Sequence, residues 1–83
     1  MKLFFRKSGK GNPIIILHGL YGCSDNWIPV ANILSDYFEV YIPDLRNHGQ
    51  SPHNEIHNYS AMSEDLFEFL KENNIEKSVI LGH

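Results

Sequence analysis

Hydrophobic residues in this 83-residue sequence form short runs separated by segments with helical spacing. The runs at residues 14–17 and 38–42 are rich in β-branched and aromatic side chains, and the first does not alternate with polar residues. A continuous apolar run of this length is typical of a parallel strand that is buried on both faces. We predict two further strands, a buried one at Ser78–Leu81 and a Phe-rich one at Lys2–Lys7.

A short helix is predicted between the two central runs. Apolar residues recur there at steps of three, three and one, which places them on one helical face: Trp27, Val30, Ile33 and Leu34. Pro29 suits the first turn of this helix, where its missing N–H leaves no intrahelical hydrogen bond unmade.

A longer amphipathic helix is predicted over residues 60–73. Its apolar positions have steps of three, four, one and three: Tyr59, Met62, Leu66, Phe67 and Leu70. We expect Ser60 to cap its N-terminus, with Glu64 and Asp65 early in the helix, where the helix dipole favours acidic groups. Asn73-Asn74 supplies a residue for the left-handed conformation that ends many helices. Four aromatic residues are expected in the core: Trp27, Tyr59, Phe67 and Phe69.

The predicted elements follow one another as strand, strand, helix, strand, helix, strand. Such alternation implies βαβ units with right-handed crossovers. The predicted fold class is therefore α/β, with a mostly parallel sheet that carries helices on both faces. We find no internal repeat or linker, so we expect one domain over residues 1–83.

Unusual residues follow three of the predicted strands: His18-Gly19, then Asp44–Gly49, then Gly82-His83. In open α/β sheets, ligands bind beyond the carboxyl ends of the strands. The sequence therefore predicts a functional site where these three strand ends meet.

His18-Gly19-Leu20 is the first of these strand ends. A glycine after a buried strand allows a sharp turn, so that the next backbone N–H can point into a site. Such an N–H can bind the oxyanion of a tetrahedral intermediate, and losing one such donor typically costs ~10²–10³ in rate. The alternative is a simple strand-ending turn with a hydrogen-bonded histidine.

The loop that follows the third predicted strand is long and polar, and loops of this length in compact domains are often functional. Its polar side chains could also tie down their own backbone. We interpret five residues as a structural loop near the site: Asp44, Arg46, Asn47, His48 and Gly49. The alternative is that His48 serves as a catalytic base.

Metal binding is not expected. His53 and His57 are four residues apart, but Pro52 and the polar surroundings argue against the helix or fixed turn that a zinc pair needs. No Cys or carboxylate cluster completes a ligand set. Cys23 has no base beside it in the sequence, so we interpret it as a bystander near the site.

Composition excludes several other functions. The formal net charge is −3, and the seven Lys and Arg residues are scattered, which gives no sign of a nucleic-acid or anionic-membrane partner. The apolar runs are far too short for a signal peptide or a membrane span. A single cysteine fits a reducing compartment, so we expect a cytoplasmic protein.

With these residues in place, the chain resembles the α/β-hydrolase superfamily along essentially its whole length. The resemblance is carried by IIILHGLYG at residues 14–22, YIPDLRNHGQS at 41–51 and VILGH at 79–83. Within the superfamily the sequence looks most like small carboxylesterases and acyl-thioesterases. Epoxide hydrolases, which have an Asp nucleophile, share the scaffold and remain an alternative.

The resemblance implies specific roles. Leu20 would supply one oxyanion N–H, with His18 and Gly19 shaping its loop. Gly82 and His83 would begin a nucleophile elbow of the G-x-S-x-G type, with the nucleophile immediately after His83. The acid and the catalytic histidine of such enzymes come later in the chain, so no catalytic residue is assigned within residues 1–83. The implied substrate is a small ester or thioester, and no cofactor is implied.

The resemblance covers only the N-terminal part of such an enzyme, so residues 1–83 are expected to form a partial α/β-hydrolase domain. We expect the isolated chain to lack esterase activity and to self-associate through a bare sheet edge. The alternative is a non-catalytic interaction module.

Overall fold

A computed structural model describes residues 1–18 and 22–82 of the chain. Strands and helices alternate along it in the predicted order. They are β1 (Phe5–Ser8), β2 (Asn12–Leu17), the short 3-10 helix η1 (Ser24–Trp27), α1 (Ile28–Leu34), β3 (Phe38–Pro43), α2 (Tyr59–Glu72) and β4 (Val79–Gly82).

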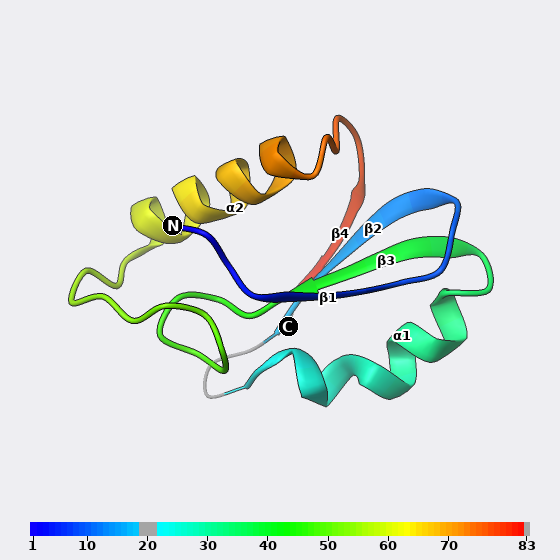
Figure 1. The fold of residues 1–83 in the computed structure, drawn as a ribbon, viewed down its shortest axis with the longest axis horizontal. Helices are drawn as coiled ribbons and strands as arrows, with labels where there is room; N and C mark the ends of the chain where they lie inside the picture. Colours follow the sequence, from blue (N-terminus) through cyan, green and yellow to red (C-terminus); the bar gives the residue numbers. More distant parts are fainter. Residues whose placement is uncertain (19–21, 83) are drawn as a thin grey trace.

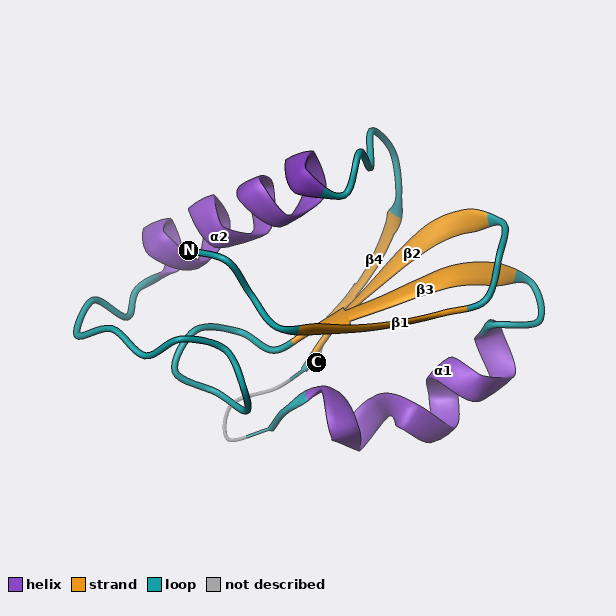
Figure 2. Ribbon diagram, in the orientation of Figure 1, coloured by secondary structure: helices purple, strands orange, loops and turns teal. Residues whose placement is uncertain are grey.

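The four strands form one sheet in the order β1-β3-β2-β4. β2 runs parallel to both β3 and β4, and β1 pairs antiparallel with β3. Figures 1 and 2 show α2 on one face of the sheet and α1 on the other. The predicted fold class, a mostly parallel α/β sheet with helices on both faces, is confirmed.

Strand alternation explains why β2 is apolar throughout. Ile14 and Ile16 pack with Ala31 of α1, whereas Ile15 packs with Phe69 of α2. Successive side chains of a strand point to opposite faces, and here each face is covered by a helix. The prediction that this strand is buried on both faces is therefore confirmed.

The buried face of α1 differs from the prediction. Trp27, Ala31 and Leu34, at steps of four and three, pack against the sheet. Val30 and Ile33 are exposed, Ile33 by 69%. The expected stripe was right at Trp27 and Leu34 and wrong at its two middle positions, because it followed the larger apolar residues and passed over the small Ala31.

β4 is not buried as predicted. It pairs with β2 and is the last strand in the sheet order, so in the described part of the chain its other edge has no strand neighbour. Three apolar side chains consequently stay exposed: Val79 by 54%, Ile80 by 47% and Leu81 by 39%. The β-branched residues allowed the strand to be predicted, but they do not show whether other parts of the protein pack against it.

The ends of α2 agree with the prediction in part. Asn58, not Ser60, is the N-cap, and its side chain accepts a hydrogen bond from the Ala61 N–H. Asn74 has the expected left-handed conformation, with φ of 56°. Phe69 is buried as expected, but Tyr59 and Phe67 are exposed. No helix among residues 1–18 and 22–82 has the length and apolar character needed to cross a membrane.

The ionisation of Tyr41 in β3 can be used to test the core on the α2 side of the sheet. Its ring is buried in that core and its hydroxyl donates to the Glu39 carboxylate. Burial, with a smaller effect of Glu39, raises the pKa of Tyr41 to about 12. Because the pKa is higher in the folded state, the protonated hydroxyl contributes its full stabilisation at pH values below the unfolded-state pKa near 10. This stabilisation is lost as the pH rises from there through the folded-state pKa of about 12.

We therefore expect alkaline unfolding across this window, with one tyrosine ionising well above the others in an ultraviolet absorbance titration. Tyr41→Phe is the matched control, because it keeps the ring and removes the titrating group. The variant should lose the late ionisation and show a flatter dependence of stability on pH above 10. Ionisation of every tyrosine near the ordinary value in the folded protein would contradict the assignment.

Candidate active site at the carboxyl ends of the strands

The carboxyl ends of β2, β3 and β4 meet at one edge of the sheet because the three strands are parallel. They line a cavity of about 750 Å³ together with the start of α2. Its lining includes Leu17 and His18 after β2, Leu45 and His48 after β3, and Gly82 at the end of β4. The predicted convergence of the strand ends is confirmed. Gly19, Leu20 and His83 lie outside the described residues, so their roles stay predictions.

His18 links the ends of two strands. The buried ring accepts a hydrogen bond at Nε2 from the Leu45 N–H, with an N–N distance of 2.9 Å. A backbone N–H can only donate, so Nε2 carries no proton and the ring is neutral in this arrangement. His18 is therefore the hydrogen-bonded histidine of the structural interpretation, and it fixes where the segment after β2 begins.

Two further imidazole rings follow His18 in a row. The His48 ring lies 5.0 Å from the His18 ring and 5.8 Å from the His57 ring, measured between centroids. Nδ1 of His48 lies 2.8 Å from the Arg46 carbonyl, which only accepts, so this nitrogen donates. His48 is thus bonded to its own loop through Nδ1, and its role stays a prediction.

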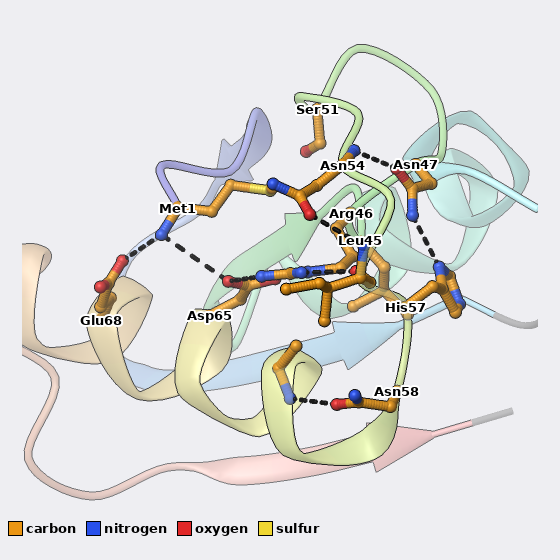
Figure 3. A network of polar contacts seen from close by, with 12 residues as sticks. Met1, Leu45, Arg46, Asn47, Ser51, Asn54, His57, Asn58, Asp65 and Glu68 are labelled. Atoms are coloured by element: carbon orange, nitrogen blue, oxygen red, sulfur yellow. Dashed lines mark hydrogen bonds and ion pairs between the residues drawn. The ribbon is translucent and has the colours of Figure 1, made fainter.

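Asn47 holds His57 and its own loop together. Its side-chain oxygen accepts from the Asn54 N–H at 2.6 Å, so its amide nitrogen donates to Nδ1 of His57 at 2.8 Å (Figure 3). Asn47 itself has a left-handed backbone, with φ of 64°. Among residues 1–18 and 22–82, no group of three or more His, Cys, Asp or Glu side chains is arranged to hold a metal ion.

Asp44 joins the loop after β2 to the loop after β3. Its buried carboxylate accepts from the Ser24 N–H at 2.6 Å and from the Gln50 N–H at 2.9 Å. Gly49, with φ of 50°, passes so close that a Cβ there would lie 2.3 Å from the Asp44 carboxylate. The close contact with Asp44 therefore requires glycine at position 49, which explains the glycine that follows His48 in this loop.

Ser51 attaches the same loop to the start of β1. Its hydroxyl accepts from the Phe4 N–H at 2.9 Å and donates to the Asp44 carbonyl. The Asp44 N–H in turn donates to the Phe4 carbonyl at 2.8 Å. The backbone of Asp44 is thus bonded to the residue before β1, while its side chain holds the loops.

Arg46 is a second buried anchor, and it reaches α2. Its guanidinium donates to both carboxylate oxygens of Asp65, at 2.6 and 2.8 Å, and to the Ile56 carbonyl at 2.6 Å (Figure 3). The hydrogen bond to Asp65 raises the pKa of the Arg46 guanidinium above its ordinary value. This geometry supports the structural interpretation of Arg46.

The sequence interpretation missed the role of Asp65. Glu64 and Asp65 were expected to lie early in the helix, where the dipole favours acids, and the first turn itself contains no acidic residue. Asp65 is instead buried under the loop. One signal was available: Asp65 lies three residues after Met62 and four before Phe69, so it falls on the apolar face of the helix.

The chain belongs to the α/β hydrolase fold family, whose sequence profile matches residues 12–83. Curated relatives include Esterase YbfF of Escherichia coli (strain K12), 39% identical over 72 residues, which cover 87% of this chain and 28% of the relative. A probable alcohol acetyltransferase of Saccharomyces cerevisiae is 43% identical over 76 residues, covering 86% of this chain and 22% of the relative.

Solved structures give the same family. A marine microorganism esterase superposes with a TM-score of 0.96 at 58% identity, over 99% of this chain and 32% of that one. A haloalkane dehalogenase from Bradyrhizobium elkanii superposes with a TM-score of 0.89 at 21% identity, which shows the fold alone. The chain spans about a quarter of the length of the curated relatives that it matches.

Gly49 provides a test of the Asp44 contact. Gly49→Ala combines a left-handed backbone with a Cβ that would overlap the Asp44 carboxylate. We expect it to lower the free energy of unfolding by ~1–3 kcal/mol, measured by urea unfolding. Gly82→Ala is the matched control, because among the described residues, its chain neighbours aside, no atom lies within 4 Å of a Cβ built at Gly82. Equal effects of the two changes would contradict the close contact.

Proposed function

We propose that this chain forms the N-terminal part of a serine esterase that acts on carboxylic esters or acyl thioesters. The observation that carries the proposal is the meeting of three strand ends, marked by His18, Leu45 and Gly82, around one cavity. Family membership supports a hydrolase, and the relatives named as esterases support an ester substrate. The acetyltransferase name also describes transfer of an acyl group, here to an alcohol.

The proposed mechanism is acyl transfer through a covalent intermediate. The Leu20 N–H would bind the oxyanion, and Gly82-His83 would lead into the nucleophile elbow. A serine at the elbow attacks the carbonyl carbon, the alcohol or thiol leaves, and water then hydrolyses the acyl-enzyme. A hydrolase with an Asp nucleophile remains the alternative.

The histidines near the cavity are proposed to be structural in this reaction. His18 uses Nε2 to accept from Leu45, and His48 uses Nδ1 to donate to its own loop. His57 accepts at Nδ1 from Asn47. These hydrogen bonds fix the rings in the loop framework, which supports a structural role; catalysis by His48 through its other nitrogen, Nε2, is the alternative.

A chimeric enzyme tests the proposal directly. The segment of the marine microorganism esterase that aligns with this chain is replaced by residues 1–83, and hydrolysis of a p-nitrophenyl ester is measured. We expect turnover from the chimera and none above the buffer background from the isolated 83-residue chain. Leu20→Pro, which removes the proposed oxyanion N–H, should lower the kcat of the chimera by ~10²–10³. A folded, monodisperse chimera without turnover would contradict the proposal.

A second candidate function, self-association, is favoured by β4. Its exposed apolar side chains lie along an edge that has no strand neighbour in the described part of the chain. Exposed edges of this kind pair readily with another chain. We therefore propose that two copies of the chain associate through β4.

Sedimentation equilibrium tests this association. We expect the apparent mass to rise with concentration for the unmodified chain, and Ile80→Lys to suppress the rise by placing a charge on the edge strand. Phe67→Lys is the matched control: Phe67 is also an exposed apolar residue, but it lies on α2. A monomer at every concentration, or equal suppression by both changes, would reject β4 as the contact.

A further inference from the structure

Three imidazole rings lie in a row along one side of the cavity: His18, His48 and His57. Their centroids are 5.0 Å apart from His18 to His48 and 5.8 Å apart from His48 to His57, and all three residues line the cavity. His18 follows β2, whereas the other two belong to the loop of residues 44–58 that joins β3 to α2. The row therefore lies between the sheet and this loop.

The hydrogen bond of His18 requires a neutral ring. Nε2 accepts from the Leu45 N–H at 2.9 Å, and the residue is only 3% exposed. A proton on Nε2 would bring two donors face to face, so protonation of this nitrogen and the hydrogen bond exclude each other. Uptake of a proton by Nε2 therefore releases Leu45 at the start of the loop.

His57 has the same requirement, which comes from Asn47 (Figure 3). Nδ1 of His57 accepts from the Asn47 side-chain nitrogen at 2.8 Å, while the Asn47 side-chain oxygen accepts from the Asn54 N–H at 2.6 Å. Turning the Asn47 amide over would place its nitrogen against the Asn54 N–H, which is also a donor. With Nδ1 of His57 protonated, no orientation of this amide keeps both hydrogen bonds.

His48 lies between the two acceptor rings. Its Nδ1 is already bonded to the Arg46 carbonyl, so His48 keeps this bond in either protonation state. Positive charges on neighbouring rings repel each other at separations of 5.0 and 5.8 Å. Charge on any two adjacent rings therefore favours their separation, and the loop moves with His48 and His57.

The charged groups around the row do not favour a proton on it. Arg46 donates to the carbonyl of Ile56, the residue before His57, and so adds a positive charge on this side. The two buried carboxylates of this region have partners of their own, because Asp65 binds Arg46 and Asp44 accepts from two backbone N–H groups. The other titratable groups of the loop and the start of α2 are exposed: His53, Glu55, Tyr59 and Glu64.

We propose that the imidazole row makes the loop of residues 44–58 acid-sensitive, so that proton uptake by His18 and His57 releases the loop and opens this side of the cavity. The closed loop needs both rings neutral and the open loop does not. The closed form is therefore favoured at high pH and is lost as the pH falls through the range of about 5 to 8 in which imidazole titrates. The proposal does not depend on which reaction the site performs.

Amide hydrogen exchange on the 83-residue chain tests the release, with each rate compared with that of the unfolded chain at the same pH. From about pH 8 to about pH 5, we expect the protection of the Leu45 amide to fall about tenfold, the typical effect of losing a buried hydrogen bond. Protection of the exposed Asn54 amide should fall by less, about threefold. Amides of β2, which is paired on both sides, should keep their protection. A parallel loss in β2 would show general unfolding and would contradict a local release.

Two variants retain the acceptors and remove the titration. In His18→Gln the side-chain oxygen takes the place of Nε2 toward Leu45, and in His57→Asn the side-chain oxygen takes the place of Nδ1 toward Asn47. We expect the first change to abolish the pH dependence at Leu45 and the second to abolish it at Asn54. The same fall in protection at both amides in the folded variants would overturn the proposal.

His53→Gln is the matched control. His53 is an exposed histidine of the same loop, and within the described part of the chain it bonds to neither Leu45 nor Asn47. We expect the control to retain the full pH dependence at Leu45 and Asn54. Loss of that dependence in His53→Gln would assign the effect to the charge of the loop as a whole and would count against the row.

Nitrogen NMR of the imidazole rings tests the same proposal in the unmodified chain, without relying on any variant to fold. The chemical shift of a ring nitrogen shows whether it carries a proton. We expect Nε2 of His18 and Nδ1 of His57 to be unprotonated at about pH 8, and each to gain its proton as the Leu45 and Asn54 amides lose protection. A protonated Nε2 of His18 beside a Leu45 amide that stays protected would overturn the proposal.

Discussion

Every polar side chain buried at the carboxyl edge of the sheet must find its hydrogen-bond partner within the protein. In the described part of the chain this requirement is met, since no buried side-chain nitrogen or oxygen lacks a partner. An unpartnered buried polar group typically costs ~1–3 kcal/mol, a large fraction of the stability of a small domain. In the observed arrangement, the loops that surround the candidate site satisfy His18, Asp44 and Arg46 together.

Two buried carboxylates accept hydrogen bonds from different kinds of donor. Asp44 accepts from backbone N–H groups and joins two loops, so its bonds fix the path of the main chain. Asp65 accepts from a guanidinium and joins the second loop to α2, so its bonds fix how a helix lies under the site.

The sequence allowed the strands, the parallel order and the meeting of the strand ends to be predicted, because these depend on apolar runs and on local turn chemistry. Asp65 was misplaced because a long-range ion pair has no local pattern apart from its position on an apolar helix face. The exposure of β4 and the true buried face of α1, through Ala31, depend on what packs nearby, and a single sequence does not contain that information. The residues of the proposed oxyanion segment, 19–21, lie outside the described structure, and their roles remain predictions.

The pairing of β1 has a consequence for the order in which this segment can fold during synthesis. β1 is synthesised before the other three strands, but its neighbour in the sheet is β3, and the Phe4 N–H bonds to Ser51, 47 residues further along the chain. Contacts of such separation form slowly because a long loop must close before they stabilise anything. The pairing of β1 and the Phe4–Ser51 hydrogen bond can therefore form only after the loop beside the candidate site has been synthesised.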